Sequence, residues 1–244
     1  MRVLVISDIH ANLNALDAVL NDAGTVDEVW CLGDIVGYGP SPNEVLARLR
    51  SLPNLTCCVL GNHDVAVLGE MNFAVFNTDA RKSLLWQQET ISADNLTFLR
   101  GLPQQSIVKE QVTLAHGSPR DPVWEYILNT LIARLNFEAF DSSYCFVGHS
   151  HIQCYFQLDL QNDRISLEVP AVNQVVQLSP RAILNPGSVG QPRDRDPRAS
   201  YAIFDTKAET WEPRRVVYDI ETVQKLIRAA GLPEKHAARL AEGW

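Results

Sequence analysis

Histidine and acidic residues of this sequence gather in a few short segments whose composition is typical of metal sites. Five of the six histidines share a segment with Asp, Asn, Gly or a second His. Imidazole and carboxylate groups are the ligands that Mn, Fe, Zn and similar divalent ions accept. The segments are Ser7-Asp8-Ile9-His10, Gly33-Asp34, Gly61-Asn62-His63-Asp64, His116-Gly117 and Gly148-His149-Ser150-His151.

The spacing inside these segments predicts that side chains of the same segment point toward a common metal ion. Asp8 and His10 lie two residues apart, as do His149 and His151. Residues i and i+2 point to the same side of an extended strand, so each pair would aim at a common centre if the backbone stays extended. A lone histidine near a strand is more often structural, but seven candidate ligands in five segments favour a metal site. One ion rarely needs more than four protein ligands, so we expect two ions, with Asp34 as the natural bridge.

The elements that must position these segments alternate between strand and helix. Apolar runs predict strands at Val3–Ser7, Glu28–Gly33 and Thr56–Leu60, and helices at Asn12–Leu20 and Val45–Leu52 lie between them. This order predicts parallel strands joined by right-handed crossovers. Each candidate segment follows a predicted strand, where open α/β sheets build their sites.

The remainder of the chain predicts a second sheet and more helices. Residues 65–101 and 122–137 are predicted to be mainly helical, and Ser106–His116 to form two strands with a turn near Lys109–Gln111. Further strands are expected at Tyr144–Val147, Cys154–Leu160, Arg164–Val169, Ala182–Leu184, Tyr201–Asp205 and Glu212–Tyr218, before a helix near Thr222–Ala230. We expect one domain over 1–244, with two packed sheets, a helical insert at about 65–101 and a helical tail at about 220–244.

Composition limits the partners. The net charge of −8 argues against general binding to nucleic acid, which relies on Lys and Arg. A small phosphorylated substrate stays open, because metal ions supply local positive charge. The apolar run Val3–Ile6 is too short for a signal peptide, and no stretch approaches the ~18 apolar residues of a membrane span. The five cysteines form no C-x-x-C pair and are predicted to be buried thiols, so we expect a cytoplasmic protein without a membrane partner. A homo-oligomer stays open.

The order of the motifs carries a resemblance. The series D-x-H, G-D, G-N-H-D, H-G and G-H-S-H, from Asp8 to His151, resembles the calcineurin-like metallophosphoesterase superfamily. The likeness continues weakly to about Asp205 through Asn185-Pro186-Gly187-Ser188. The glycine-rich run after Asn185 and the lack of long insertions resemble its small bacterial and archaeal phosphodiesterase-like branch. The resemblance implies an α/β fold, a four-layer αββα sandwich of two mixed sheets, with metals at one edge of the sheets.

The resemblance also implies roles for individual residues. The first metal ion is expected on Asp8, His10 and His151, the second on Asn62, His116 and His149, with Asp34 bridging them. Mn is favoured over Fe, Zn or Ni. His63 is expected to face the substrate as general acid or phosphate contact, and Asn12 to contact phosphate. Asp64 is expected either to orient His63 or to be a helix N-cap.

The implied activity is metal-dependent hydrolysis of phosphodiesters or phosphomonoesters. In two-metal sites an activated hydroxide attacks phosphorus directly. We expect His63, near its unperturbed pKa of about 6.5, to protonate the leaving oxygen. Two alternatives are a scaffold of the same fold that lost catalysis, although this chain keeps every candidate ligand, and a nuclease, which would favour a basic groove.

One departure from the superfamily separates branches. The protein Ser/Thr phosphatases carry G-D-x-x-D-R-G, whereas this chain reads Gly33-Asp34-Ile35-Val36-Gly37-Tyr38-Gly39. The second Asp and the Arg are absent. This puts protein phosphatase activity in doubt, and with it the related dinucleoside-polyphosphate hydrolases.

Weaker signals concern the substrate. Among three arginines in 191–198, Arg193 is favoured as a bidentate phosphate contact, although a solvated loop with local Arg–Asp pairs is the plainer interpretation. Trp86, Trp124 and Tyr126 are expected either to roof the cleft or to belong to the core. His236, in a helical tail, is expected to have no catalytic role.

Overall fold

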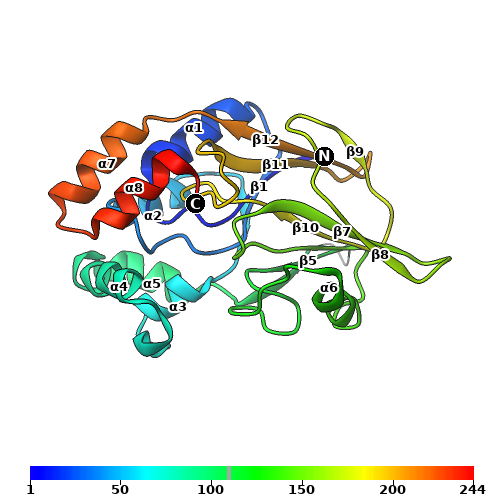
Figure 1. Ribbon diagram of the computed structural model, residues 1–244, viewed down its shortest axis with the longest axis horizontal. Coiled ribbons are helices and arrows are strands. Elements are labelled where there is room, and N and C mark those ends of the chain that lie inside the picture. The colour runs from blue at the N-terminus through cyan, green and yellow to red at the C-terminus, as the bar shows by residue number, and fades with distance from the viewer. Residues whose placement is uncertain (109–110) are drawn as a thin grey trace.

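Two six-stranded mixed sheets lie face to face in the computed structural model, which describes residues 1–108 and 111–244 (Figure 1). The first sheet has the order β3-β2-β1-β11-β12-β9, and the second β4-β5-β6-β10-β7-β8. The first contains β1 (Arg2–Ile6), β2 (Glu28–Cys31), β3 (Leu55–Cys58), β9 (Val176–Gln177), β11 (Ala199–Asp205) and β12 (Thr210–Val216). The second contains β4 (Gln105–Val108), β5 (Val112–Ala115), β6 (Tyr144–Phe146), β7 (Gln153–Asp159), β8 (Arg164–Glu168) and β10 (Ala182–Pro186). Lys109 and Glu110, in the predicted turn between β4 and β5, lie outside the described residues.

The parallel strands confirm the expected crossovers. In the first sheet β1 pairs in parallel with β2, and β2 with β3. The connecting helices are α1 (Leu13–Ala23) and α2 (Pro42–Arg50). In the second sheet β6 is parallel to both β5 and β10. Parallel neighbours end at the same edge of a sheet, so the segments that follow β1, β2 and β3, and those that follow β5 and β6, bring the predicted ligands to one edge.

The pleat of β1 explains how one strand serves two cores. Val3 and Val5 point into the core between the sheets, whereas Leu4 and Ile6 point to the helices on the other face. Aromatic rings fill the space between the sheets, and the ring centroids of Phe146 and Phe204 are 5.1 Å apart. All these side chains are buried, so neither face of β1 meets solvent.

Helices cover both outer faces. Helices α1 and α2 pack against the first sheet together with α3 (Asn62–Val67), α4 (Thr78–Thr90) and α5 (Ala93–Arg100). Helix α6 (Thr130–Phe137) packs against β7 and β8 of the second sheet. The predicted αββα sandwich is thereby confirmed, and 65–101 is mainly helical as expected.

Two C-terminal helices form a hairpin at the left of Figure 1. They are α7 (Ile220–Ala229) and α8 (Glu234–Glu242), and they share an apolar cluster that includes Val223 and Leu240. Trp86 of α4 packs against this cluster. Trp86 therefore belongs to the core and does not roof a cleft, because the hairpin covers it.

The prediction of a helix over 122–137 is wrong in its first half. Helix α6 begins only at Thr130, where the side chain of Asn129 accepts a hydrogen bond from the Ile132 N–H at 3.0 Å. The preceding residues form turns that bring two aromatic side chains toward the site described below. Ser41 occupies the N-cap of α2 and has Glu44 three residues on, a spacing that favours a capping box, but its side chain makes no capping hydrogen bond.

Four cysteines are buried thiols, as predicted: Cys31, Cys58, Cys145 and Cys154. The prediction is wrong for Cys57, which is only partly buried on β3. Within the part of the chain that the structure describes, every helix is too short or too polar to cross a membrane.

Candidate metal centre

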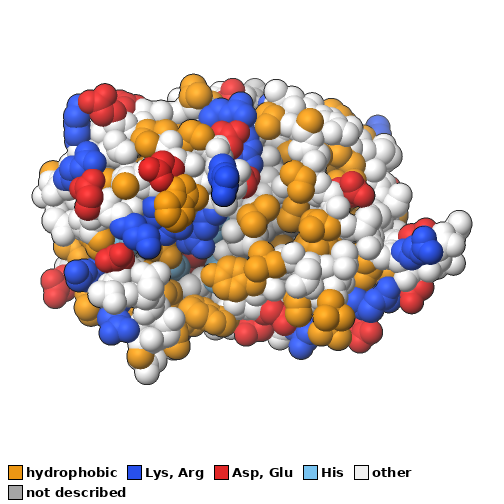
Figure 2. Space-filling view, in the orientation of Figure 1, with side chains coloured by type: hydrophobic (Ala, Val, Ile, Leu, Met, Phe, Trp, Pro, Cys, Tyr) orange, Lys and Arg blue, Asp and Glu red, His pale blue; other side chains and the backbone are white. Residues whose placement is uncertain are grey.

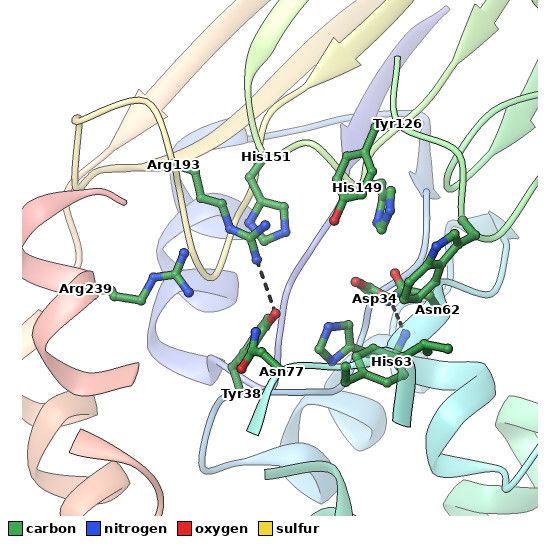
Figure 3. Close-up of a pocket in the computed structure, with 13 residues that line it drawn as sticks. Asp34, Tyr38, Asn62, His63, Asn77, Tyr126, His149, His151, Arg193 and Arg239 are labelled. Atoms are coloured by element: carbon green, nitrogen blue, oxygen red, sulfur yellow. Dashed lines mark hydrogen bonds between the residues drawn. The ribbon is translucent and has the colours of Figure 1, made fainter. Parts of the chain in front are cut away.

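The seven predicted ligands meet at one edge of the sandwich. Six lie in loops that follow β1, β2, β5 and β6, Asn62 is the first residue of α3 after β3, and each of the seven residues is at most 3% exposed. Strand ends from both sheets meet here, so residues far apart in sequence become neighbours. Figure 3 shows Asp34, Asn62, His149 and His151 around one cavity.

A first group consists of Asp8, His10 and His151, whose candidate ligand atoms all lie within 4.8 Å of one another. The Nε2 atoms of His10 and His151 are 3.2 Å apart. His151 Nε2 also lies 3.2 Å from Asp8 Oδ1. This is the set that the resemblance assigned to one ion.

A second group consists of Asp34, His116 and His149, again within 4.8 Å. His116 Nε2 lies 3.1 Å from His149 Nδ1 and 3.1 Å from Asn62 Oδ1. Asp34 also forms a further group with His10 and His63, and so connects the two sides: its Oδ2 is 3.4 Å from His116 Nε2 and 3.6 Å from His10 Nε2. One carboxylate oxygen thus faces both sets, as a bridging ligand must.

Backbone carbonyls fix the tautomers of three histidines. The Nδ1 atoms of His10, His116 and His151 lie 3.0, 2.9 and 2.5 Å from carbonyl oxygens of Val36, Leu32 and Gln191. Because a carbonyl only accepts, each Nδ1 carries a proton, so in the neutral ring Nε2 is the nitrogen that presents a lone pair. These lone pairs point at one another and at carboxylates, which is repulsive unless a cation lies between them. The residues present therefore fit divalent metal ions.

The backbone that carries these ligands is left-handed, which corrects the expectation of extended pairs. The φ angles of Asp8, His10, Asp34, His149 and His151 lie between 49° and 63°. Such conformations cost roughly 1–3 kcal/mol each and cluster at functional sites. His149 and His151 consequently do not share a centre: they turn to different groups.

Burial sets the protonation of the histidines. It lowers the pKa of His10, His149 and His151 well below the usual value, so they are neutral at pH 7, the form that binds metal. His116 differs, because the adjacent Asp34 outweighs burial and raises its pKa to about 9. His116 therefore carries a second proton, on Nε2, at pH 7, and a metal ion between Asp34 and His116 would take the place of this proton.

The two carboxylates of the centre respond to burial differently. Burial raises the pKa of Asp8 to about 7. Burial would also raise the pKa of Asp34, but His116 and then His63 outweigh it and hold that pKa well below its usual range. Asp34 is therefore the permanent negative charge between the two groups.

His63 lies beside the centre and faces the cavity. Its backbone N–H donates to Asp34 Oδ1 at 2.9 Å, and its ring centroid is 4.5 Å from that of Tyr38. Its Nδ1 is buried without a hydrogen-bond partner. Burial lowers its pKa to about 4, so the expectation of a value near 6.5 is wrong.

Asp64 has neither of its predicted roles. Gly61 is the N-cap of α3, and Asp64 is the third helical residue. The Asp64 carboxylate accepts hydrogen bonds from the N–H groups of Gly61, Ile35 and Val36 at 2.9, 3.3 and 3.0 Å. It ties the loop after Asp34 to α3, and no hydrogen bond to the His63 ring occurs among the described contacts.

Asn12 caps α1. Its Oδ1 accepts from the Ala15 N–H and its Nδ2 donates to the Gly190 carbonyl, both at 3.1 Å. It does not line the cavity beside the metal centre. Its predicted phosphate contact stays a prediction, to which the structure adds a capping role.

The cavity has a volume of about 240 Å³. Trp124 and Tyr126 line it, as one interpretation of the sequence expected, and Tyr126 stacks on His149 with ring centroids 3.7 Å apart. The insert at about 65–101 contributes Val75, Phe76 and Asn77 to the lining, and sequence reasoning missed Tyr38 and Arg239, which also line it. Tyr38 stands between two glycines in the Asp34 loop, a signal that could have been used, whereas nothing in its local sequence marks Arg239.

A sequence profile of the calcineurin-like phosphoesterase superfamily domain matches residues 1–209. The chain belongs to this superfamily. The protein MJ0912 of Methanocaldococcus jannaschii is 39% identical over 248 residues, covering 99% of this chain and 98% of its own. Calcineurin-like membership makes the chain a metallophosphoesterase, a phosphoric ester hydrolase by family.

Solved calcineurin-like structures agree. A metallophosphoesterase from Sphaerobacter thermophilus superposes with a TM-score of 0.90 at 49% identity, over 100% of this chain and 99% of that one. PH1004 from Pyrococcus horikoshii OT3 shares the fold, with a TM-score of 0.78 at 21% identity over 100% and 98%. The solved structures similar to this chain are thus metallophosphoesterases of the small bacterial and archaeal type.

A more distant likeness covers only part of the chain. The symmetrical bis(5'-nucleosyl)-tetraphosphatase of Baumannia cicadellinicola is 30% identical over 121 residues, 48% of this chain and 42% of its own. The chain therefore aligns with less than half of that relative's length.

Proposed function

We propose that this protein hydrolyses small phosphoesters, phosphodiesters or phosphomonoesters, at a centre of two divalent metal ions. One observation carries the proposal: Asp34 Oδ2 faces His10 Nε2 at 3.6 Å and His116 Nε2 at 3.4 Å. The Asp34 carboxylate thereby joins two sets of candidate ligands. Asp8, His10 and His151 would hold one ion, and Asn62, His116 and His149 the other.

Two ions bound there would neutralise phosphoryl oxygens and lower the pKa of an attacking water. The chain's own residues supply the rest. His63 lines the cavity, where its ring can donate a proton to the leaving oxygen. Its pKa of about 4 leaves it neutral at pH 7 in the free protein. A negatively charged phosphoryl group beside it would raise this pKa, so the ring would take up a proton from solvent as substrate binds.

Asp64 acts as a positioning residue in this proposal. Its hydrogen bonds to the backbone of Ile35 and Val36 fix the loop that carries Asp34. Val36 in turn offers its carbonyl to His10 Nδ1 at 3.0 Å. The orientation of one ligand thus depends on a carboxylate that touches neither the ions nor the substrate.

A substrate panel after reconstitution with Mn²⁺ tests the function. We expect turnover of bis(p-nitrophenyl) phosphate or p-nitrophenyl phosphate, and none of single-stranded DNA, since the chain carries a net charge of −8. Asp34→Asn is the matched control, because it keeps the side-chain shape and removes the charge. A reconstituted protein that cleaves none of the esters would support the scaffold alternative, and preferential DNA cleavage would support the nuclease.

The choice of metal and the partners are part of the proposal. Nitrogen and oxygen ligands without thiolates suit Mn²⁺, which we favour over Fe, Zn or Ni. A small phosphorylated molecule is the proposed partner. The cytoplasmic location and a homo-oligomer stay predictions.

A further inference from the structure

Two arginines from different parts of the chain line the cavity beside the metal centre. Arg193 belongs to the loop after β10, and Arg239 to α8. Figure 3 shows both guanidinium groups pointing into the cavity from the side opposite Asp34 and Asn62. Figure 2 shows Lys and Arg side chains gathered at the centre-left of this face, where the surface is hollowed.

Arg193 is held in place by neutral groups. Its Nη2 lies 3.3 Å from the Tyr38 hydroxyl and 3.2 Å from Gln191 Oε1, and its buried Nε has no acceptor. The carboxylates of the same loop are engaged elsewhere: Asp196 pairs with Arg198, and Asp194 with Arg215. Among the ion pairs of the described residues, none neutralises Arg193.

Arg239 is likewise without a side-chain carboxylate partner among the ion pairs of the described residues. Its Nε donates to the main-chain oxygen of Trp244, the last residue of the sequence. Burial, and then the charge of Arg193, lower the pKa of its guanidinium. The helix end is fixed to the Arg193 loop, because the Arg195 N–H donates to the Gly243 carbonyl at 2.7 Å. Two adjacent cations thus face one cavity with donors to spare.

The two arginines stand at increasing distance from the metal ligands. Arg193 lies close enough to act on the pKa of Asp8, His10 and His151, and both arginines act on that of Tyr38. Figure 3 agrees, with Arg239 beyond Arg193 as seen from Asp34. The cavity of about 240 Å³ equals the volume of roughly eight waters, more than one phosphate at the metal ions would fill.

We propose that Arg193 and Arg239 together bind a second, non-scissile phosphate group, and that the substrate is a small phosphoester carrying two phosphates. The inference rests on the proposed function, because the first phosphate is the one at the metal ions. A guanidinium group binds phosphate through paired N–H donors. Two guanidinium groups balance the two negative charges of a phosphate dianion, whereas one is enough for a carboxylate. Arg193 lies within residues 1–209, the part that matches the superfamily profile, and Arg239 lies outside it, so the C-terminal hairpin contributes one half of the proposed site.

Non-hydrolysable probes test the inference without turnover. The Mn²⁺-loaded protein would be titrated calorimetrically with methylphosphonate, phosphonoacetate and methylenebisphosphonate. We expect the bisphosphonate to bind about tenfold or more tightly than methylphosphonate, since a charge-assisted hydrogen bond contributes at least that factor. Arg239→Ala should remove most of this preference and change methylphosphonate binding less than about twofold, with Arg193→Ala behaving alike. Elemental analysis after each titration confirms that the probe has not extracted the metal.

The matched control is Lys235→Ala, which removes one positive charge from the exposed face of the same helix. It should leave all three affinities unchanged. Equal weakening of every probe in Arg239→Ala, an intact bisphosphonate preference, or equal binding of phosphonoacetate and bisphosphonate would each overturn the second-phosphate site. Turnover of p-nitrophenyl esters is measured separately, so a protein that hydrolyses them but lacks the preference refutes this inference and leaves the proposed function standing.

Discussion

The Nε2 atoms of His10 and His151 face each other at 3.2 Å, and each ring carries its proton on the opposite nitrogen. Two lone pairs in that relation would repel without a cation between them, and a divalent ion held there would form a bond with each nitrogen. Metal uptake should therefore stabilise the fold as well as enable catalysis.

Removal of metal by a chelator should lower the melting temperature, and Mn²⁺ should restore it. At about 100 times the dissociation constant a ligand stabilises by about 2.7 kcal/mol, which corresponds to roughly 5–10 °C for a chain of this size. Differential scanning fluorimetry measures the shift. His10→Ala should shrink it, whereas His236→Gln, at a buried histidine outside the centre, should keep it. The same shift in both variants would contradict ligation by His10.

Asp34→Asn should lower the metal content of both sites together. The substitution removes the charge that Oδ2 presents to His10 and His116, the two sides of the centre. Elemental analysis should find well below one equivalent, compared with about two in the wild type and about one in His151→Ala. Two full equivalents in Asp34→Asn would rule out the bridge.

His63→Ala should keep its metal and lose turnover. General acid catalysis contributes about 10²–10⁴-fold, and the loss should be larger for alkyl esters than for p-nitrophenyl esters, whose leaving group needs no proton. Steady-state kinetics on both ester types, beside metal analysis of the same sample, checks this. Equal losses on both esters would argue for a phosphate contact, and loss of metal would place His63 among the ligands.

His236 should make the fold sensitive to acid. Burial lowers its pKa below the unfolded value of 6.5, so the unfolded chain binds more protons between the two values. Stability from the neutral ring is therefore present above about pH 6.5 and lost as pH falls. The difference in melting temperature between wild type and His236→Gln, measured from pH 8 to pH 5, should shrink toward acid pH. A difference that stays constant with pH would show that His236 does not titrate on unfolding.

The ligand positions could be predicted from the sequence because strand ends are local and meet by topology. Asp8, Asp34 and His116 each follow a short buried strand, and parallel order places their loops at one edge. The reason first given for their convergence was nevertheless wrong, since the backbone at Asp8 and His10 is left-handed and not extended. Only tertiary hydrogen bonds, such as that from the Asp8 N–H to the Gly33 carbonyl, impose that conformation.

The parts that could not be predicted depend on contacts between distant segments. Arg239 reaches the cavity because α8 packs on α7 and its end bonds to the Arg193 loop, and no local pattern announces this. The turns before Asn129 have a helical apolar spacing, yet Trp124 and Tyr126 are drawn to the ring of His149. Likewise the pKa of His63 follows from its complete burial, which spacing does not reveal.

Arg239 is separated along the chain from the residues that match the superfamily profile. The metal ligands and Arg193 lie within the matched part, whereas the other arginine of the proposed pair comes from the terminal hairpin. A change confined to this hairpin would therefore alter one half of the pair and leave the reacting groups as they are.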